Sequence, residues 1–284
     1  MAAGGTVLVV GADGEIGTAV ARQLEASGSS VVHTSRRGTA DSLPLDLAAA
    51  VSSWSLPSGV SAAVLCAAVS STEACWNDPV EARRVNVEAT LELARRLAIA
   101  GSRLVFLSTN LVFDGRVPFV PADAPRCPRT AYGRMKAEVE KELFALDAAT
   151  TVVRLTKVVG RPLPVFTRWR EALARGEPVH PFSDMVMAPV TLAVAASVIV
   201  AAAREPLGDI LQVSARADVS YAEVARRLAA RWGFSADLVT PTVTAGAGLR
   251  LEHVPPHTTL DPSAVRDRLS LEPPDPWAAV EEVA

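Results

Sequence analysis

The stretch TVLVVGADGEIG, residues 6–17, predicts how the chain begins to fold. Residues 6–11 are an apolar run typical of a buried strand, and apolar residues then recur at helical spacing as far as Leu24. Gly11, Gly14 and Gly17 stand in the turn between these two elements. Glycines in such a turn let the backbone approach a phosphate group closely, and the N-terminus of the helix stabilises its negative charge. The stretch therefore predicts a strand–turn–helix unit that binds a phosphate-bearing ligand.

Strand and helix signals alternate through the first half of the chain. Apolar runs at 30–35, 61–68, 103–108 and 151–155 are separated by segments with helical periodicity. This alternation is typical of a parallel sheet with helices on both faces. We therefore predict an α/β fold with a Rossmann-type doubly wound parallel sheet.

The pattern changes after residue 157, where prolines become frequent (GRPLPVF, EPVHPF, VPPH, EPPDPW). We expect a dinucleotide-binding domain over residues 1–157 and a smaller C-terminal substrate-binding lobe over residues 158–284. The lobe is expected to lie on the carboxyl end of the sheet, where ligands of such folds bind. The apolar run at 208–214 is expected to return to the sheet of the first domain.

The composition excludes several classes of protein. The 284 residues are 49% hydrophobic and 21% charged, as in folded rather than disordered chains. The net charge is −3 and no long block of Lys and Arg occurs, which argues against nucleic acid as a partner. The uncharged segment 186–203 contains Pro189 and is rich in alanine, so it predicts a buried helix rather than a membrane span.

The cysteines and the first residues predict a cytoplasmic protein. Cys66, Cys75 and Cys127 have irregular spacings, which argues against a disulfide framework and fits a reducing compartment. The first residues lack the basic region of a signal peptide.

The glycine turn favours a dinucleotide, and the end of the second strand predicts which one. The spacing is GxxGxxG and opens a helix after the first strand, which favours cofactor binding over a plain turn. NAD sites usually carry Asp or Glu after the second strand, but here TSRRG supplies Arg36 and Arg37. Arginines can bind a 2′-phosphate bidentately, so we predict NADP, with NADPH preferred over NADH. The alternative is that both arginines are solvated surface residues.

Further contacts with the cofactor are expected in three places. Asp46 is expected to meet the adenine amino group, and the small side chains after the third strand let the cofactor lie close. The remaining predicted cofactor-binding residues are Glu15, Ile16, Leu47, Cys66, Ala67 and Ala68.

The stretch TAYGRMKAEVE, residues 130–140, places Tyr132 and Lys136 on one face of a predicted helix. A neighbouring cation favours phenolate, so Lys136 is expected to lower the pKa of Tyr132 from its usual value of about 10. Together with a bound nicotinamide, such a pair could donate a proton to a ketone. The alternative is an ordinary half-exposed helix face.

These motifs resemble the extended short-chain dehydrogenase/reductase family, and within it the sugar-nucleotide reductases of the dTDP-4-dehydrorhamnose reductase type. The likeness is carried by GADGEIG (11–17), VNVEAT (85–90), LSTNLVFDG (107–115), AYGRMKAEVE (131–140), VRLTKVVG (153–160) and the C-terminal TTLDPSAVRDRLSLEPPDPWAAVEEV (258–283). These segments follow the family's order over nearly the whole chain.

The resemblance implies NAD(P)H-dependent reduction of a keto sugar nucleotide of the 4-keto-6-deoxyhexose type. Thr109, Tyr132 and Lys136 are then the catalytic residues: Tyr132 gives its proton to the ketone oxygen, Thr109 orients that oxygen, and Lys136 also holds the nicotinamide ribose. Asn86 resembles the family's helix asparagine, which holds structure or a water near the lysine. The implied partner is a nucleotide-sugar substrate, with no membrane or nucleic acid, and a homodimer remains open.

The sequence departs from the reductase pattern on the substrate side. Asn110 and Leu111 follow the threonine where the group often has Asp and Tyr. Lys157 stands where the group places an aromatic residue, and a lysine there could meet a nucleotide phosphate or a carboxylate.

Other functions and sites are weaker alternatives. Asn110 and Leu111 cannot exchange the proton that a 4,6-dehydratase must move, whereas a sugar-nucleotide 4-epimerase remains open. A non-catalytic cofactor-binding subunit, like the regulatory subunit of methionine adenosyltransferase, is a further alternative. His253 and His257 have metal-site spacing, but two prolines lie between them, so no metal site is predicted.

Overall fold

A parallel sheet of seven strands forms the centre of the computed structural model, which describes residues 5–146, 148–245, 247–248 and 251–284. The strand order is β10-β6-β5-β4-β1-β2-β3, and each neighbouring pair is parallel. The strands are β1 (Thr6–Val10), β2 (Val31–Ser35), β3 (Leu43–Pro44), β4 (Val60–Leu65), β5 (Arg103–Thr109), β6 (Thr150–Leu155) and β10 (Ile210–Val213).

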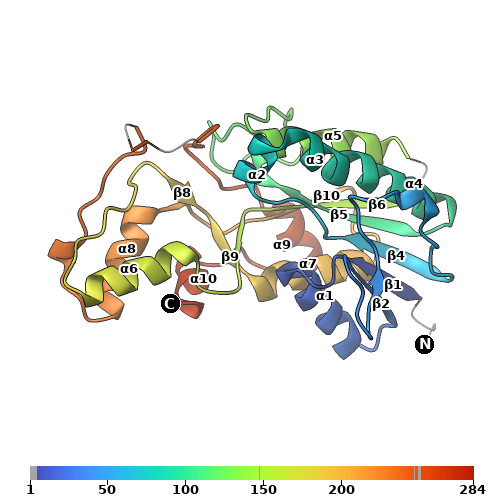
Figure 1. The fold of residues 1–284 in the computed structure, drawn as a ribbon, viewed down its shortest axis with the longest axis horizontal. Helices are drawn as coiled ribbons and strands as arrows, with labels where there is room; N and C mark the ends of the chain where they lie inside the picture. The colour runs from blue at the N-terminus through green and yellow to red at the C-terminus, as the bar shows by residue number, and fades with distance from the viewer. Residues whose placement is uncertain (1–4, 147, 246, 249–250) are drawn as a thin grey trace.

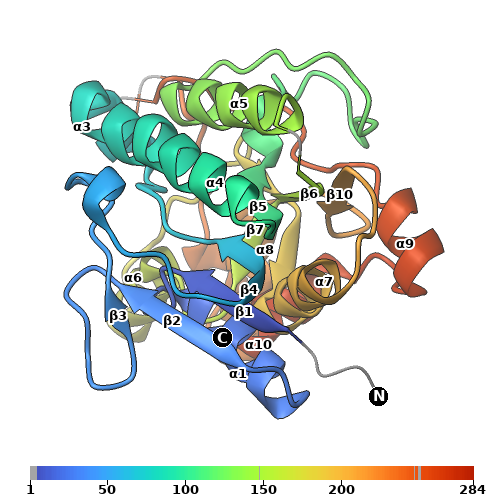
Figure 2. The same cartoon turned by 90° about the vertical axis from the view of Figure 1, so that its right-hand side faces the viewer.

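Helices cover both faces of this sheet (Figure 2). One face packs against α1 (Glu15–Ala26), α7 (Leu192–Arg204) and α9 (Ser263–Leu269), and the other against α4 (Thr90–Ile99) and α5 (Ala131–Phe144). Alternate residues of a strand point to opposite faces. In β1, Val7 and Val9 accordingly pack on the face covered by α1, while Leu8 and Val10 pack on the face covered by α4. The predicted fold class is confirmed.

Two short helices and a π-helical turn precede α4, with a break at Asp78 between the two helices. They are α2 (Thr72–Asn77), α3 (Pro79–Arg83) and the π-helical turn (Arg84–Ala89), and α3 begins at the N-cap Asp78, whose carboxylate accepts from the Glu81 N–H. Single turns of 3-10 helix occur at Val51–Ser53, Asn110–Val112 and Ala236–Leu238.

The uncharged segment 186–203 divides into two short strands and α7. Small buried side chains such as Ala195 and Ala202 let α7 pack closely against the sheet and α1. Across the part of the chain that the structure describes, no helix has the length and apolar character needed to cross a membrane.

A second, smaller core lies beside the sheet (Figure 1). It is built around α6 (Pro164–Ala174), α8 (Tyr221–Arg231) and α10 (Pro276–Glu282), where the rings of Phe166 and Trp169 stack with centroids 5.6 Å apart. Four short strands pair in two ribbons: β7 (Lys157–Val159) with β9 (Pro189–Thr191), and β8 (Val186–Met187) with β11 (Val219–Ser220).

The chain passes between the two cores more than once. β10 pairs with β6 at the edge of the central sheet, and α7 and α9 pack on one face of that sheet. Much of the segment after residue 157 therefore belongs with the sheet, and the second core is formed by the remaining parts.

Candidate active site

A cavity of about 810 Å³ opens at the carboxyl ends of β1, β4, β5 and β6. It brings together every predicted site residue except Arg37, namely Gly11, Gly14, Glu15, Ile16, Gly17, Arg36, Asp46, Leu47, Cys66, Ala67, Ala68, Thr109, Tyr132 and Lys136. Arg37 is exposed next to Arg36 and lies outside the lining. The carboxyl ends of parallel strands are where this fold class binds ligands.

The glycine turn forms one end of the cavity. Gly11 has a φ of +82°, which L side chains rarely adopt, and a Cβ there would lie 2.9 Å from the Cα of Ala67. A Cβ on Gly17 would lie 2.1 Å from the carbonyl oxygen of Gly11, so both positions need glycine for the turn itself. A Cβ on Gly14 would meet nothing closer than 3.4 Å. Gly14 is therefore not needed for packing and leaves room on the cavity side of the helix N-terminus.

The end of β2 lines the same part of the cavity. Arg36 is exposed there, with its side chain available to a ligand. The carboxylate of Asp46 accepts from the Ala48 N–H at 2.9 Å, which orients the loop after β3.

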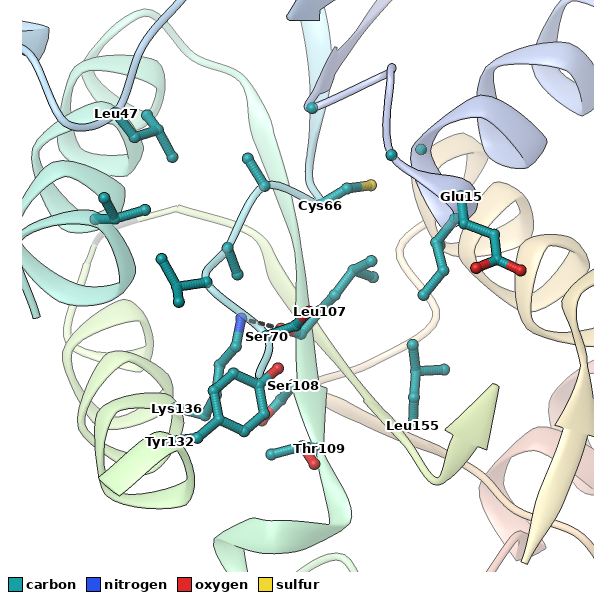
Figure 3. A pocket seen from close by; sticks show the side chains of 18 of the residues that line it. Glu15, Leu47, Cys66, Ser70, Leu107, Ser108, Thr109, Tyr132, Lys136 and Leu155 are labelled. Carbon is teal, nitrogen blue, oxygen red and sulfur yellow. Dashed lines mark hydrogen bonds between the residues drawn. The ribbon is translucent and has the colours of Figure 1, made fainter. Parts of the chain in front are cut away.

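Thr109, Tyr132 and Lys136 lie together at the other end of the cavity (Figure 3). Thr109 ends β5, and its Oγ1 accepts from the Leu111 N–H at 3.2 Å. Tyr132 and Lys136 come from the first turns of α5, with the Lys136 Nζ 5.7 Å from the centre of the tyrosine ring. Thr130 caps this helix by accepting from the Gly133 N–H at 3.0 Å. The side chains of Tyr132 and Thr109 are neighbours facing the cavity.

Burial controls the ionisation of the pair. It lowers the pKa of Lys136 to about 8, an effect partly offset by Cys66 and Glu140. The Lys136 Nζ donates to the Leu107 carbonyl oxygen at 2.8 Å. Burial also raises the pKa of Tyr132, which is opposite to the direction expected from a neighbouring cation. The expectation was wrong for this structure because desolvation of the buried phenol dominates its pKa, and Cys75 acts in the same direction.

Asn86 shapes the wall after β4. Its side-chain amide lies in the π-helical turn, accepts from the Val69 N–H at 2.8 Å and donates to the Val69 carbonyl oxygen at 2.9 Å. Val69 lines the cavity, so the buried amide of Asn86 satisfies both backbone groups of a lining residue.

Comparison with known proteins identifies the family. Residues 5–284 match the family model described as the RmlD substrate binding domain. The chain belongs to this family. The match covers nearly the whole chain, so the resemblance to reductases of the dTDP-4-dehydrorhamnose reductase type is confirmed.

Two relatives of this RmlD family member bear on its activity. A protein of Streptomyces antibioticus, named a probable dTDP-4,6-dihydroxy-2-methyloxan-3-one 4-ketoreductase, is 30% identical over 203 residues, which are 70% of this chain and 67% of that protein. Methionine adenosyltransferase 2 subunit beta of Bos taurus is 34% identical over 98 residues, or 34% of this chain. The matched segment spans only 29% of the length of that subunit.

Solved structures share the RmlD-type fold. A dTDP-4-dehydrorhamnose reductase from Bacillus anthracis in complex with NADP has a TM-score of 0.83 and 19% identity, covering 99% of this chain and 98% of that one. MoeE5 in complex with UDP-glucuronic acid and NAD has a TM-score of 0.79 and 25% identity, covering 95% of this chain and 94% of that one.

A buried ion pair behind the site was missed from the sequence of this RmlD family member. Glu140 and Arg154 are both 0% exposed and form two hydrogen bonds of 3.0 and 2.7 Å. The Ser108 hydroxyl also donates to Glu140 at 2.5 Å. Glu140 follows Lys136 by four residues on α5, and that spacing, together with an arginine inside the apolar strand VVRL, was the signal that could have found the pair.

Lys157, at the start of β7, lines the cavity of this RmlD-type chain. The residue is exposed, yet enough protein surrounds its ammonium for burial to lower the pKa, and Glu15 acts in the opposite direction. Glu15 itself pairs with the exposed Arg161 at 3.5 Å. Among the ion pairs of the described residues, Lys157 has no partner.

The histidines near the C-terminus of this family member are engaged in other contacts. His253 Nε2 donates to the Asp114 carbonyl oxygen at 2.7 Å, and His257 lies 3.5 Å from the carboxylate of Asp218. Within residues 5–146, 148–245, 247–248 and 251–284, no group of three His, Cys, Asp or Glu side chains is arranged to hold a metal ion.

Proposed function

We propose that the protein is an NADPH-dependent reductase of a keto sugar nucleotide, of the 4-keto-6-deoxyhexose type, and that it works in the cytoplasm. The observation that carries this proposal is the cavity itself. It joins a glycine turn at one end to Thr109, Tyr132 and Lys136 at the other. The second core, around α6, α8 and α10, would form the substrate-binding lobe, and the dinucleotide-binding domain would end just after β6.

The residues present fit a dinucleotide. The N-terminus of α1 has no side-chain cap, so its N–H groups are free to bind a pyrophosphate. Gly14 leaves space for that approach, and Arg36 offers a guanidinium to a 2′-phosphate. Lys136 uses one of its three N–H groups on Leu107, which leaves two for the hydroxyls of a ribose.

The residues of the chain divide the chemistry between them. When bound, NADPH supplies a hydride to the carbonyl carbon of the substrate. Tyr132 donates its phenolic proton to the carbonyl oxygen, and the Thr109 hydroxyl donates a hydrogen bond to the same oxygen. The Lys136 ammonium supports the phenolate that remains.

The substrate class is supported by the relatives. The Streptomyces antibioticus protein is named for reduction of a keto group on a dTDP sugar. This favours a dTDP-linked ketone, and a uridine nucleotide is the first alternative because MoeE5 binds UDP-glucuronic acid. A 4-epimerase would use the same three side chains, but each reaction cycle would leave the cofactor in its starting redox state.

A non-catalytic regulatory subunit is the second candidate function. The match to methionine adenosyltransferase 2 subunit beta favours it, although that match covers only 98 residues. The presence of Thr109, Tyr132 and Lys136 in one cavity favours catalysis, because partner binding requires none of them.

Turnover of NADPH with a panel of dTDP- and UDP-linked keto sugars tests the proposal. Tyr132→Phe removes only the hydroxyl, so we expect the fold and NADPH binding to survive. General acid catalysis contributes about 10²–10⁴-fold, and the rate of reduction should fall by about that factor. A Tyr132→Phe variant with the full rate would remove Tyr132 from the chemistry. Absence of turnover with every ketone in the unmodified protein would favour the regulatory subunit.

A further inference from the structure

The N-terminus of the helix that carries Tyr132 is held by a residue from the C-terminal part of the chain. Both carboxylate oxygens of Glu252 accept from the Ala131 N–H, each at 3.0 Å. The Glu252 side chain is only 11% exposed. A carboxylate binds a backbone N–H more strongly than a neutral acceptor does, and a helix N-terminus favours negative charge. The contact is therefore a strong link between Glu252 and the first turn of α5.

A close backbone approach fixes the same turn against the end of β5. A Cβ on Gly133 would lie 2.1 Å from the Leu111 carbonyl oxygen, so the turn lies directly against the segment after Thr109. The Thr109 hydroxyl accepts from the N–H of the same Leu111. Tyr132 thus sits on a turn held by Leu111 and by Glu252, and a small shift of this turn changes the distance between the phenol and Thr109.

The segment that carries Glu252 is firmly docked. His253 donates to the Asp114 carbonyl oxygen at 2.7 Å, and the His257 N–H donates to the Gly115 carbonyl oxygen at 2.9 Å. Leu260 is 1% exposed and packs against Val112 and Phe113, which come just before Asp114 in the chain. These contacts hold the segment that carries Glu252 in place beside the start of α5.

We propose that Glu252 is a positioning residue for Tyr132, holding the first turn of α5 so that the phenol faces the cavity beside Thr109. This inference rests on the proposed function, since it concerns the proton donor of that reaction. The bond to the Ala131 N–H carries the effect. The ion pair of Glu252 with Arg134, at 3.3 Å, is more than half exposed on the arginine side and contributes little.

Three variants test the proposal. Glu252→Ala removes the acceptor, whereas Glu252→Gln retains an acceptor oxygen for the Ala131 N–H. Asp184→Ala is the matched control, because the Asp184 carboxylate accepts from the Thr244 N–H at 2.9 Å and lies outside the cavity lining. It therefore removes the same kind of contact, a carboxylate that accepts from a backbone N–H, from a partner outside α5.

We expect Glu252→Ala to lower kcat by about 10- to 100-fold, as small misplacements of a catalytic group do, with the Kd for NADPH unchanged. Glu252→Gln should keep most of the parent rate, and Asp184→Ala all of it. Rescue by glutamine separates positioning from a general loss of structure. An unchanged kcat in Glu252→Ala, or an equal loss in Asp184→Ala, would overturn the proposal.

Amide hydrogen exchange gives a readout that does not depend on turnover. Glu252→Ala should speed exchange at the first turn of α5 several-fold, while Asp184→Ala leaves it unchanged. Unchanged exchange in Glu252→Ala would show that Glu252 does not hold the turn. A parent protein that binds NADPH but reduces no keto sugar nucleotide would overturn the proposed function instead, and the exchange data would still decide whether Glu252 holds the helix.

Discussion

At the scale of single residues, Tyr132 and Lys136 share an environment that favours the neutral form of each. The pKa of Tyr132 is raised by burial, so the phenol is protonated at neutral pH, as a proton donor must be. The pKa of Lys136 is lowered to about 8, so the side chain is still mostly an ammonium ion near pH 7. Burial therefore leaves both residues in the states that the proposed reaction needs.

Arg36 and Arg37 form a matched pair for testing cofactor preference. We expect Arg36→Ala to weaken NADPH binding by about 1–3 kcal/mol, through loss of charge-assisted hydrogen bonds to the 2′-phosphate, and to leave NADH binding nearly unchanged. Arg37→Ala is the control, because Arg37 lies outside the cavity lining. Fluorescence titration with both cofactors measures the effect. Equal affinities of the parent for NADPH and NADH would contradict the expectation.

Lys157 is expected to contact an anionic part of the substrate. Lys157 lines the cavity without an ion-pair partner among the described residues, and an anion bound there would offset the desolvation cost of its partly buried ammonium. Lys157→Met should therefore raise the KM for the sugar nucleotide and leave the Kd for NADPH unchanged. Arg161→Met is the control, since it removes a nearby exposed charge that pairs with Glu15. A weakened NADPH complex would instead assign Lys157 to the cofactor.

At the scale of elements, α5 carries most of the candidate chemistry. Tyr132, Lys136 and Glu140 follow one another at intervals of four residues and so lie on one face of the helix. Glu140 binds the buried Arg154 of β6, and Glu252 binds the first turn. The helix is thus bonded to the sheet through Glu140 in its second half and to the C-terminal segment at its first turn. These two contacts fix the position of α5 relative to the sheet.

Two glycines of the turn before α1 are expected to have different roles, Gly17 in the fold and Gly14 in cofactor binding. We expect Gly17→Ala to destabilise the protein by about 1–3 kcal/mol, because its Cβ overlaps the Gly11 carbonyl and the helix must move. Gly14→Ala should leave the melting temperature unchanged but weaken NADPH binding, because its Cβ meets no protein atom closer than 3.4 Å and would occupy space needed by a pyrophosphate. Thermal unfolding and cofactor titration of the two variants distinguish these roles. Normal NADPH binding by Gly14→Ala would place the pyrophosphate elsewhere.

At the scale of the whole molecule, the cavity lies at the carboxyl ends of the central strands, and its lining extends as far as Val158 of β7. The sheet contributes its carboxyl ends, and β7 leads directly from β6 towards the second core. The cavity also contains the buried, ionisable Lys136, whose desolvation lowers the free energy of unfolding by an amount that depends on pH.

Lys136 should destabilise the free protein at neutral pH. Its folded pKa of about 8 lies below the usual 10.5, so between these values the unfolded state binds more protons than the folded state. The free energy of unfolding should therefore rise as the pH is raised through this window, and the burial cost is present in full below about pH 8.

We accordingly expect Lys136→Met to be more stable than the parent at pH 7, with the difference shrinking as the pH approaches 10.5. Denaturant unfolding across this pH range measures the effect. Lys141→Met is the control, since Lys141 is exposed on the same helix. A stability difference that is constant over the whole range would show that Lys136 is not neutralised in the fold.

The sequence by itself determined the parallel sheet, the glycine turn and the spacing of Tyr132 and Lys136. Each of these depends on periodicity or spacing over a few neighbouring residues, which can be read along the chain. The strand predicted at 151–155 and the return strand at 208–214 correspond to β6 and β10 for the same reason.

Only the tertiary structure decided the ionisation of the pair and the contacts that hold it. The direction of the tyrosine pKa depends on how much of the protein surrounds the phenol, and no local pattern carries that quantity. Arg36 and Arg37 are adjacent in sequence, yet only Arg36 lines the cavity. Glu252 reaches Ala131 from 121 positions along the chain, because folding brings its segment against the start of α5. Contacts of this kind are set by the packing of distant segments, which residue spacing along the chain does not encode.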